Sequence, residues 1–139
     1  SLNRLRPGAL EGRTLKDALE KMIREYQTLS NLQVDLHYEW VDVDMDVMIE
    51  DTIFRVIQES MTNAVRHGHA SQMSLHFFED EEDYLIELQD NGVGFETLTY
   101  GYGLKQMMER ISILGGQLQF ESRDGFFTRV SLPKYKEGR

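Results

Sequence analysis

Apolar positions along the chain switch repeatedly between helical and strand spacing, and this predicts the order of its elements. Spacings of three and four residues predict helices, whereas strict alternation predicts strands. These spacings predict a helix over 14–29, a strand over 34–40, a helix over 46–67, strands over 71–78 and 83–90, a helix over 103–114, and strands over 117–122 and 126–132. The predicted order is therefore αβαββαββ.

The strands also indicate the fold class, because each of them carries only one apolar face. A sheet with one apolar face is covered by helices on that face alone. We therefore expect an α+β fold, a two-layer α/β sandwich with a mixed, roughly five-stranded sheet and about three helices on one face. Thr14 suits the start of the first helix, and Asp44 or Asp46 that of the second. The glycine-rich segment 91–103 is expected to be a loop.

Composition excludes several classes of protein. The net charge is −9 and no basic block is present, which argues against binding of nucleic acid or of an anionic membrane surface. The absence of cysteine excludes disulfides and thiolate metal sites. No apolar run approaches the ~20 residues that span a bilayer. The chain of 139 residues starts at Ser1 rather than at a methionine, and we expect it to be part of a longer protein.

Polar residues gather on one side of the second predicted helix. Glu59, Asn63, Arg66 and His67 are spaced at i, i+4, i+7 and i+8, which places them on neighbouring turns. Carboxylate and amide oxygens suit a hydrated Mg²⁺ ion, and the two basic side chains suit phosphate. An amphipathic helix with a mixed polar edge would show the same pattern, so this cluster alone does not decide the function.

A carboxylate ends an apolar row on the strand over 83–90. Asp90 shares a strand face with Ile86 and Leu88, so we expect it to be buried and to have hydrogen-bond partners. Such a carboxylate could accept a hydrogen bond from an exocyclic amine such as that of adenine. The sequence Asp-Asn-Gly is equally typical of a turn.

Glycines then precede the third predicted helix. Gly92 and Gly94 permit close backbone approach, and Gly101 and Gly103 lead into a helix start, where free N–H groups favour anionic phosphates. The spacing is neither that of a P-loop nor that of a Rossmann fingerprint. A flexible linker would have the same composition.

Three motifs occur here in a specific order: Glu-x-x-x-Asn on a helix, Asp-Asn-Gly-Val-Gly-Phe at a strand end, and Gly-Tyr-Gly-Leu at a helix start. Together they resemble the catalytic and ATP-binding domain of sensor histidine kinases, in the ATPase superfamily that includes DNA gyrase B, Hsp90 and MutL. The stretches 5–7, 54–59 and 107–110 and the short lid are similar to the nitrate-sensor and DesK-like subfamily. The resemblance covers residues 5–133.

The resemblance implies a Bergerat ATP-binding fold and a division of the chain into three parts. Residues 1–13 would be a lead-in from an upstream dimerisation and phosphoacceptor domain, 14–133 the ATP-binding catalytic domain, and 134–139 a C-terminal tail. The activity would be transfer of the ATP γ-phosphoryl group to a histidine of the absent domain, with ADP as product, for onward transfer to an aspartate of a response regulator.

The resemblance also implies roles for the polar residues. Asp90 would bind the adenine amine. Asn63 would hold Mg²⁺ against the ATP phosphates, and Glu59 would help to coordinate that ion or orient the reacting groups. Arg66 and His67 would contact phosphate.

The glycine motifs have implied roles as well. Gly92 and Gly94 would line the adenine pocket, and Thr128 would lie near adenine. Backbone N–H groups in the second glycine motif would meet the phosphates, a role that falls to Gly101, Gly103 and Leu104. Residues 95–102 would form the ATP lid.

Two departures from the family pattern stand out. The family usually has Gly-x-Gly-Thr before its last strand, and here Phe127 occupies the second glycine position. The basic residue after the helix asparagine is often lysine, and here it is Arg66. In addition, no histidine lies on an N-terminal helix, so we expect the phosphoacceptor histidine to lie outside this chain.

Two alternatives remain open on the sequence alone. One is a serine kinase of the anti-sigma-factor type, and the other is a nucleotide-sensing module without catalysis, which Phe127 favours. For the kinase reading, the resemblance implies that this part of the chain is monomeric and cytoplasmic, and makes no direct membrane contact. The parent protein would be a homodimer anchored in the cell membrane.

Overall fold

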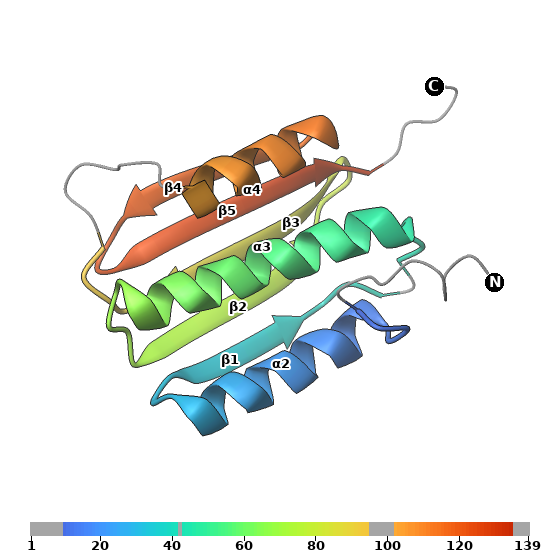
Figure 1. Cartoon of the computed structure of the whole chain (residues 1–139). Coiled ribbons are helices and arrows are strands. Elements are labelled where there is room, and N and C mark those ends of the chain that lie inside the picture. Colours follow the sequence, from blue (N-terminus) through green and yellow to red (C-terminus); the bar gives the residue numbers. More distant parts are fainter. Residues whose placement is uncertain (1–9, 42, 95–101, 135–139) are drawn as a thin grey trace.

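The computed structural model describes residues 10–41, 43–94 and 102–134 (Figure 1). Its elements, labelled as in Figure 1, are α2 (Leu15–Leu29), β1 (Gln33–Tyr38), α3 (Val47–Arg66), β2 (Gln72–Glu79), β3 (Asp83–Asp90), α4 (Tyr102–Ile113), β4 (Gln117–Ser122) and β5 (Phe126–Pro133). The predicted order of helices and strands is confirmed.

The five strands form one sheet in the order β1-β2-β3-β5-β4. β1 pairs with β2 in parallel, and the other neighbouring strands are antiparallel, so the sheet is mixed as predicted. The helices α2, α3 and α4 all lie on one face of this sheet (Figure 1). The expected two-layer sandwich is therefore confirmed.

Helices α2 and α3 each begin directly after a residue whose side chain caps a free backbone N–H group. The Thr14 hydroxyl accepts a hydrogen bond of 3.1 Å from the N–H of Asp17, and the Asp46 carboxylate accepts one of 2.7 Å from the N–H of Met48. Asp46, and not Asp44, therefore caps α3.

The core lies between the helices and the covered face of the sheet. Buried side chains of α3 pack there with alternate residues of β2 and β3, and the fully buried ones include Ile57, Met61, Leu75, Phe77, Ile86 and Leu88. A 2.6 Å hydrogen bond between the hydroxyl groups of Tyr26 and Thr62 ties α2 to α3. Leu10, within the predicted lead-in, also belongs to this core.

Strand β1 ends at Tyr38, two residues before the predicted end at residue 40. Trp40 nevertheless stays buried, and its indole N–H donates a 2.6 Å hydrogen bond to the carbonyl of Phe78. Trp40 therefore continues the alternating pattern of buried residues in β1 without being part of the strand. Within the described residues, no helix is long and apolar enough to cross a membrane.

Candidate functional site

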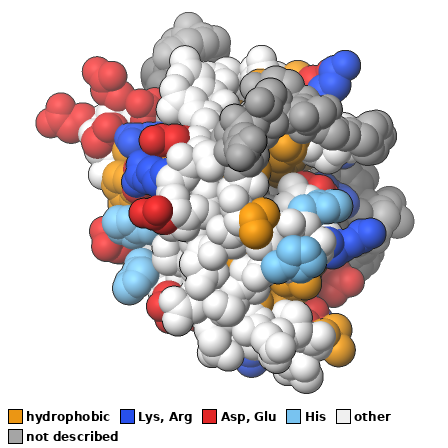
Figure 2. All heavy atoms as spheres, turned by 90° about the vertical axis from the view of Figure 1, so that its left-hand side faces the viewer, with side chains coloured by type: hydrophobic (Ala, Val, Ile, Leu, Met, Phe, Trp, Pro, Cys, Tyr) orange, Lys and Arg blue, Asp and Glu red, His pale blue; other side chains and the backbone are white. Residues whose placement is uncertain are grey.

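Four segments meet at one end of the molecule: the end of α3, the end of β3, the start of α4 and the turn between β4 and β5 (Figure 1). These segments carry the residues that the sequence singled out. Figure 2 looks onto this end, where backbone and uncharged polar side chains occupy much of the centre together with a hydrophobic side chain, and acidic, basic and histidine side chains lie on both sides of them. Sequence positions more than 60 residues apart, such as Glu59 and Thr128, are thus brought to one region.

Asp90 is a buried carboxylate held in a fixed orientation. The residue is only 6% exposed. Its Oδ1 atom accepts two backbone hydrogen bonds, from the N–H of Gly92 at 2.8 Å and from the N–H of Phe126 at 3.0 Å. Both bonds to described residues use the same oxygen. The carboxylate is therefore anchored by one oxygen, as a buried charge requires.

The backbone after Asp90 packs directly against the end of α3. The N–H of Val93 donates to the carbonyl of Gly68 at 3.0 Å. The Asn91 side-chain oxygen accepts from the N–H groups of Ser71 and Gln72 at 2.8 and 2.9 Å. A Cβ atom added at Gly92 would lie only 2.5 Å from the Gly68 carbonyl oxygen. Glycine at position 92 is therefore required by this backbone-to-backbone approach.

Replacing Gly92 with alanine should lower the free energy of unfolding by about 2 kcal/mol, since backbone atoms cannot rotate away from the added carbon. Gly12 is the comparison, because a Cβ atom there meets nothing within 4 Å although φ is +81°. Gly12→Ala should cost about 1 kcal/mol from backbone strain alone. Urea unfolding measures both values, and a Gly12→Ala cost equal to the Gly92→Ala cost would contradict the packing argument.

Glu59 and Gly103 bring α3 and the start of α4 together. A Cβ atom added at Gly103 would lie 2.7 Å from the Glu59 Cδ atom, so the glycine fits against the carboxylate. One turn further along α3, the partly buried Asn63 side chain makes no hydrogen bond to any described residue. The Glu59 carboxylate thus lies beside the backbone at the start of α4.

The other residues predicted to contact phosphate make few contacts that fix their side chains. Arg66 and His67 are exposed at the end of α3, where His67 is the C-cap and its N–H donates to the Asn63 carbonyl at 2.9 Å. Leu104 is partly buried and packs against the core. Gly101 lies outside the described residues, as does all of the predicted lid except Tyr102.

Thr128 and Phe127 point to opposite faces of the sheet. Thr128 is 3% exposed and pairs with Leu88 across β3 and β5, so its side chain shares the covered face with Asp90. Phe127 pairs with Gln89 on the other face, where the Arg123 guanidinium lies 3.9 Å from its ring centre. The residue that replaces the usual glycine is therefore directed away from Asp90.

Two glycines that the sequence analysis did not assign to the site also shape it. Gly68 forms the surface against which Gly92 packs. Gly125 has φ +134°, and a Cβ atom there would lie 3.1 Å from the Asn91 Cα atom. Gly94 has φ +67°, and a Cβ atom added there would lie 2.7 Å from the Gly125 carbonyl oxygen. The sequence signal was a glycine at a helix end and one in a hairpin turn.

Comparison with known proteins identifies the family. Residues 48–136 match the family described as histidine kinase-, DNA gyrase B-, and HSP90-like ATPase. The chain belongs to this ATPase family. The domain is 35% identical over 138 residues to the signal transduction histidine-protein kinase/phosphatase UhpB of Salmonella typhimurium, and 31% identical over 131 residues to the sensor histidine kinase LiaS of Bacillus subtilis. These alignments cover 96% and 92% of the ATPase domain but only 27% and 36% of the two relatives.

Solved structures confirm the fold of this ATPase domain. The histidine kinase AdeS of Acinetobacter baumannii superposes with a TM-score of 0.75 at 20% identity, over 87% of this chain and 65% of that one. The histidine kinase domain of the Erythrobacter litoralis blue-light activated kinase EL346 superposes with a TM-score of 0.74 at 16% identity, over 93% and 64%. The expected Bergerat fold is thus confirmed.

Proposed function

We propose that this ATPase domain is the catalytic part of a two-component sensor histidine kinase. It binds Mg²⁺ and ATP and transfers the γ-phosphoryl group to a histidine of an upstream dimerisation domain, from which a response regulator receives it. The relatives UhpB and LiaS are both named as histidine kinases, which supports this reaction. Because the chain spans about a quarter to a third of their length, the acceptor domain would lie elsewhere in the parent protein.

The anchoring of Asp90 is the observation that carries the proposal. Two backbone N–H groups hold Oδ1, at 2.8 and 3.0 Å, and leave Oδ2 free of hydrogen bonds to the described residues. An ionised carboxylate only accepts hydrogen bonds, so Oδ2 suits the amino group of adenine and not the carbonyl at the same position of guanine.

The chemistry of the neighbouring residues suits the phosphate end of the nucleotide. Asn63 and Glu59 supply hard oxygen ligands for Mg²⁺, which would neutralise charge on the phosphates of ATP. Gly103 and Leu104 offer backbone N–H groups at a helix start, where they favour phosphate oxygens. Arg66 and His67 provide exposed cationic or polar contacts at the end of α3.

The two alternatives have less support. Phe127 lies on the far side of the sheet from Asp90, which weakens the argument from this residue for a non-catalytic nucleotide sensor. A serine kinase of the anti-sigma-factor type would share the nucleotide site, but the relatives are histidine kinases. We further propose a homodimeric, membrane-anchored parent in which this domain lies in the cytoplasm.

Titration calorimetry with ATP and GTP tests the nucleotide preference. ATP should bind at least about tenfold more tightly than GTP, because guanine places a carbonyl against the Asp90 carboxylate and leaves that acceptor unpaired. Mg²⁺ should strengthen the binding of ATP. Equal affinities for ATP and GTP would contradict the role of Asp90.

A further inference from the structure

A groove runs between α2 and β1, formed by residues that take no part in the proposed nucleotide site. Its volume is about 620 Å³. Its apolar floor consists of Ile23 from the helix and Val34, Leu36 and Tyr38 from the strand. A second hollow of about 420 Å³ continues from it and shares Lys16 and Tyr38.

The strand beside this groove has a free edge, one that pairs with no other strand among the described residues. β1 is the first strand in the sheet order, and among the described residues only β2 pairs with it. The N–H groups of Gln33 and Glu39 donate to carbonyls on the β2 side, at 2.9 and 2.8 Å. Because alternate residues of a strand direct their backbone groups to opposite edges, Leu36 and Tyr38 direct theirs to the free edge.

One position on this edge is already occupied. The N–H of Val34 donates a 2.8 Å hydrogen bond to the side-chain oxygen of Gln27 from α2. No described residue satisfies the edge groups of Leu36 and Tyr38 in this way. The available backbone therefore begins after Val34 and lies along the groove.

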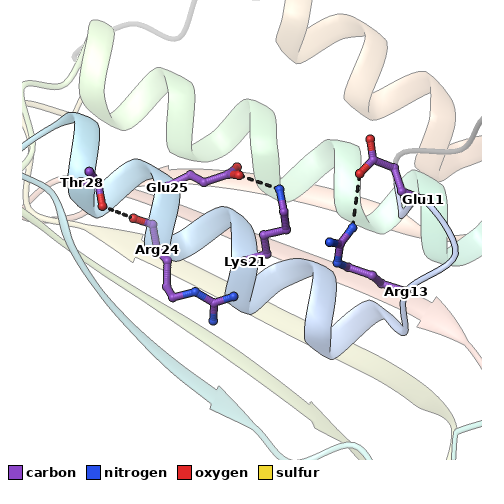
Figure 3. Close-up of polar contacts among 6 residues, drawn as sticks. All are labelled: Glu11, Arg13, Lys21, Arg24, Glu25 and Thr28. Atoms are coloured by element: carbon purple, nitrogen blue, oxygen red, sulfur yellow. Dashed lines mark hydrogen bonds and ion pairs between the residues drawn. The ribbon is translucent and has the colours of Figure 1, made fainter.

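Two cationic side chains of α2 lie at the groove. Lys16 and Arg24 line it, and neither forms an ion pair with a described residue. By contrast, Lys21 on the same helix is paired with Glu25 at 2.6 Å. Figure 3 shows this pair and shows the Arg24 guanidinium pointing away from it. Lys16 and Arg24, unlike Lys21, therefore line the groove together with the residues of β1.

The spacing of these cations matches an extended chain. Lys16 and Arg24 are eight helical residues apart, which corresponds to about 12 Å along α2. Side chains four residues apart on one face of a strand are separated by about 13 Å. Carboxylates at positions i and i+4 of a strand paired with β1 would therefore lie opposite both cations. The residue between them would face the apolar floor and Glu20, which also lines the groove.

We propose that the free edge of β1 and the groove beside α2 bind an extended acidic segment of a partner protein by strand addition. Main-chain hydrogen bonds to Leu36 and Tyr38 provide affinity, and Lys16 and Arg24 select carboxylates four residues apart. A second copy of this chain fits less well, because edge-to-edge pairing would bring its Lys16 and Arg24 toward those of the first copy. The net charge of −9 repels an acidic partner mainly at long range. At 0.1 M salt, charges separated by more than about 10 Å are largely screened from one another.

The probe is an end-capped peptide, Thr-Glu-Thr-Val-Thr-Glu-Thr, added to the isotope-labelled chain. Binding should shift the amide resonances of Leu36 and Tyr38, with smaller changes near Asp90. A peptide with glutamine in place of both glutamates should bind more weakly, and one with its three central amides N-methylated should not bind.

Charge reversal on α2 gives the matched comparison. Lys16→Glu and Arg24→Glu should each weaken binding of the glutamate peptide about three- to tenfold. Lys21→Glu makes the same change of charge on the same helix outside the groove and should leave the affinity unchanged. The proposal would be overturned if the N-methylated or the glutamine peptide bound as tightly as the glutamate peptide, or if the glutamate peptide did not bind. It would also be overturned if the shifts were confined to the nucleotide end, or if sedimentation showed that the chain dimerises through β1.

Discussion

Replacing Asp90 with asparagine is expected to weaken ATP binding about 5- to 150-fold, because it leaves a buried hydrogen bond unmade. The asparagine oxygen can still accept from the N–H groups of Gly92 and Phe126. Its NH₂ group then faces the amino group of adenine, so a donor meets a donor. In the opposite orientation the NH₂ group faces the two backbone N–H groups, which is less favourable still.

The matched control is Asp35→Asn, which removes the same charge at an exposed position of β1. Calorimetry of both variants separates the local contact from the change in net charge. Urea unfolding of Asp90→Asn shows whether the domain remains folded at the temperature of the titration. An ATP affinity unchanged in folded Asp90→Asn would show that Asp90 does not bind adenine.

Replacing Asn63 with alanine is expected to slow phosphoryl transfer about 100- to 1000-fold, the range found when one preorganised polar group is removed from an active site. The Asn63 amide would hold Mg²⁺ against the phosphates. Binding of ATP with Mg²⁺ should therefore weaken more than binding of ADP without metal. Calorimetry and a phosphotransfer assay measure the two effects.

Gln58→Ala is the control for Asn63→Ala, because it removes an exposed amide five residues earlier on the same helix. It should change neither metal-dependent binding nor transfer. If Asn63→Ala weakened both nucleotides equally, the residue would act in packing and not in binding the metal.

The sequence predicted the elements closely because their signals are local. Helix and strand periodicity reflects which face is buried. The side chains of Thr14 and Asp46 accept hydrogen bonds from backbone N–H groups only three and two residues further along the chain. The burial of Asp90 followed from strand alternation in the same way, and its 6% exposure agrees with it.

The contacts between distant segments could not be predicted. Phe126 lies 36 positions from the Asp90 carboxylate that it caps, and nothing in either local sequence indicates the bond. The approach of Gly92 to Gly68 likewise depends on how β3 ends against α3. The direction of Phe127 was accessible in principle, because it alternates with Thr128, but this required the strand register that only the structure provides.

The most direct test of the central claim is incubation with γ-labelled ATP, with and without the separately produced upstream domain of the parent protein. Transfer requires an acceptor aligned with the γ-phosphate, and this chain is proposed to lack that acceptor. The chain alone should bind ATP and acquire no stable phosphohistidine. With the upstream domain added, acid-labile label should appear on that domain only, and slowly, because the tether that raises its effective concentration is absent. Acid-labile label on the 139-residue chain alone, removed by His67→Ala, would contradict the account.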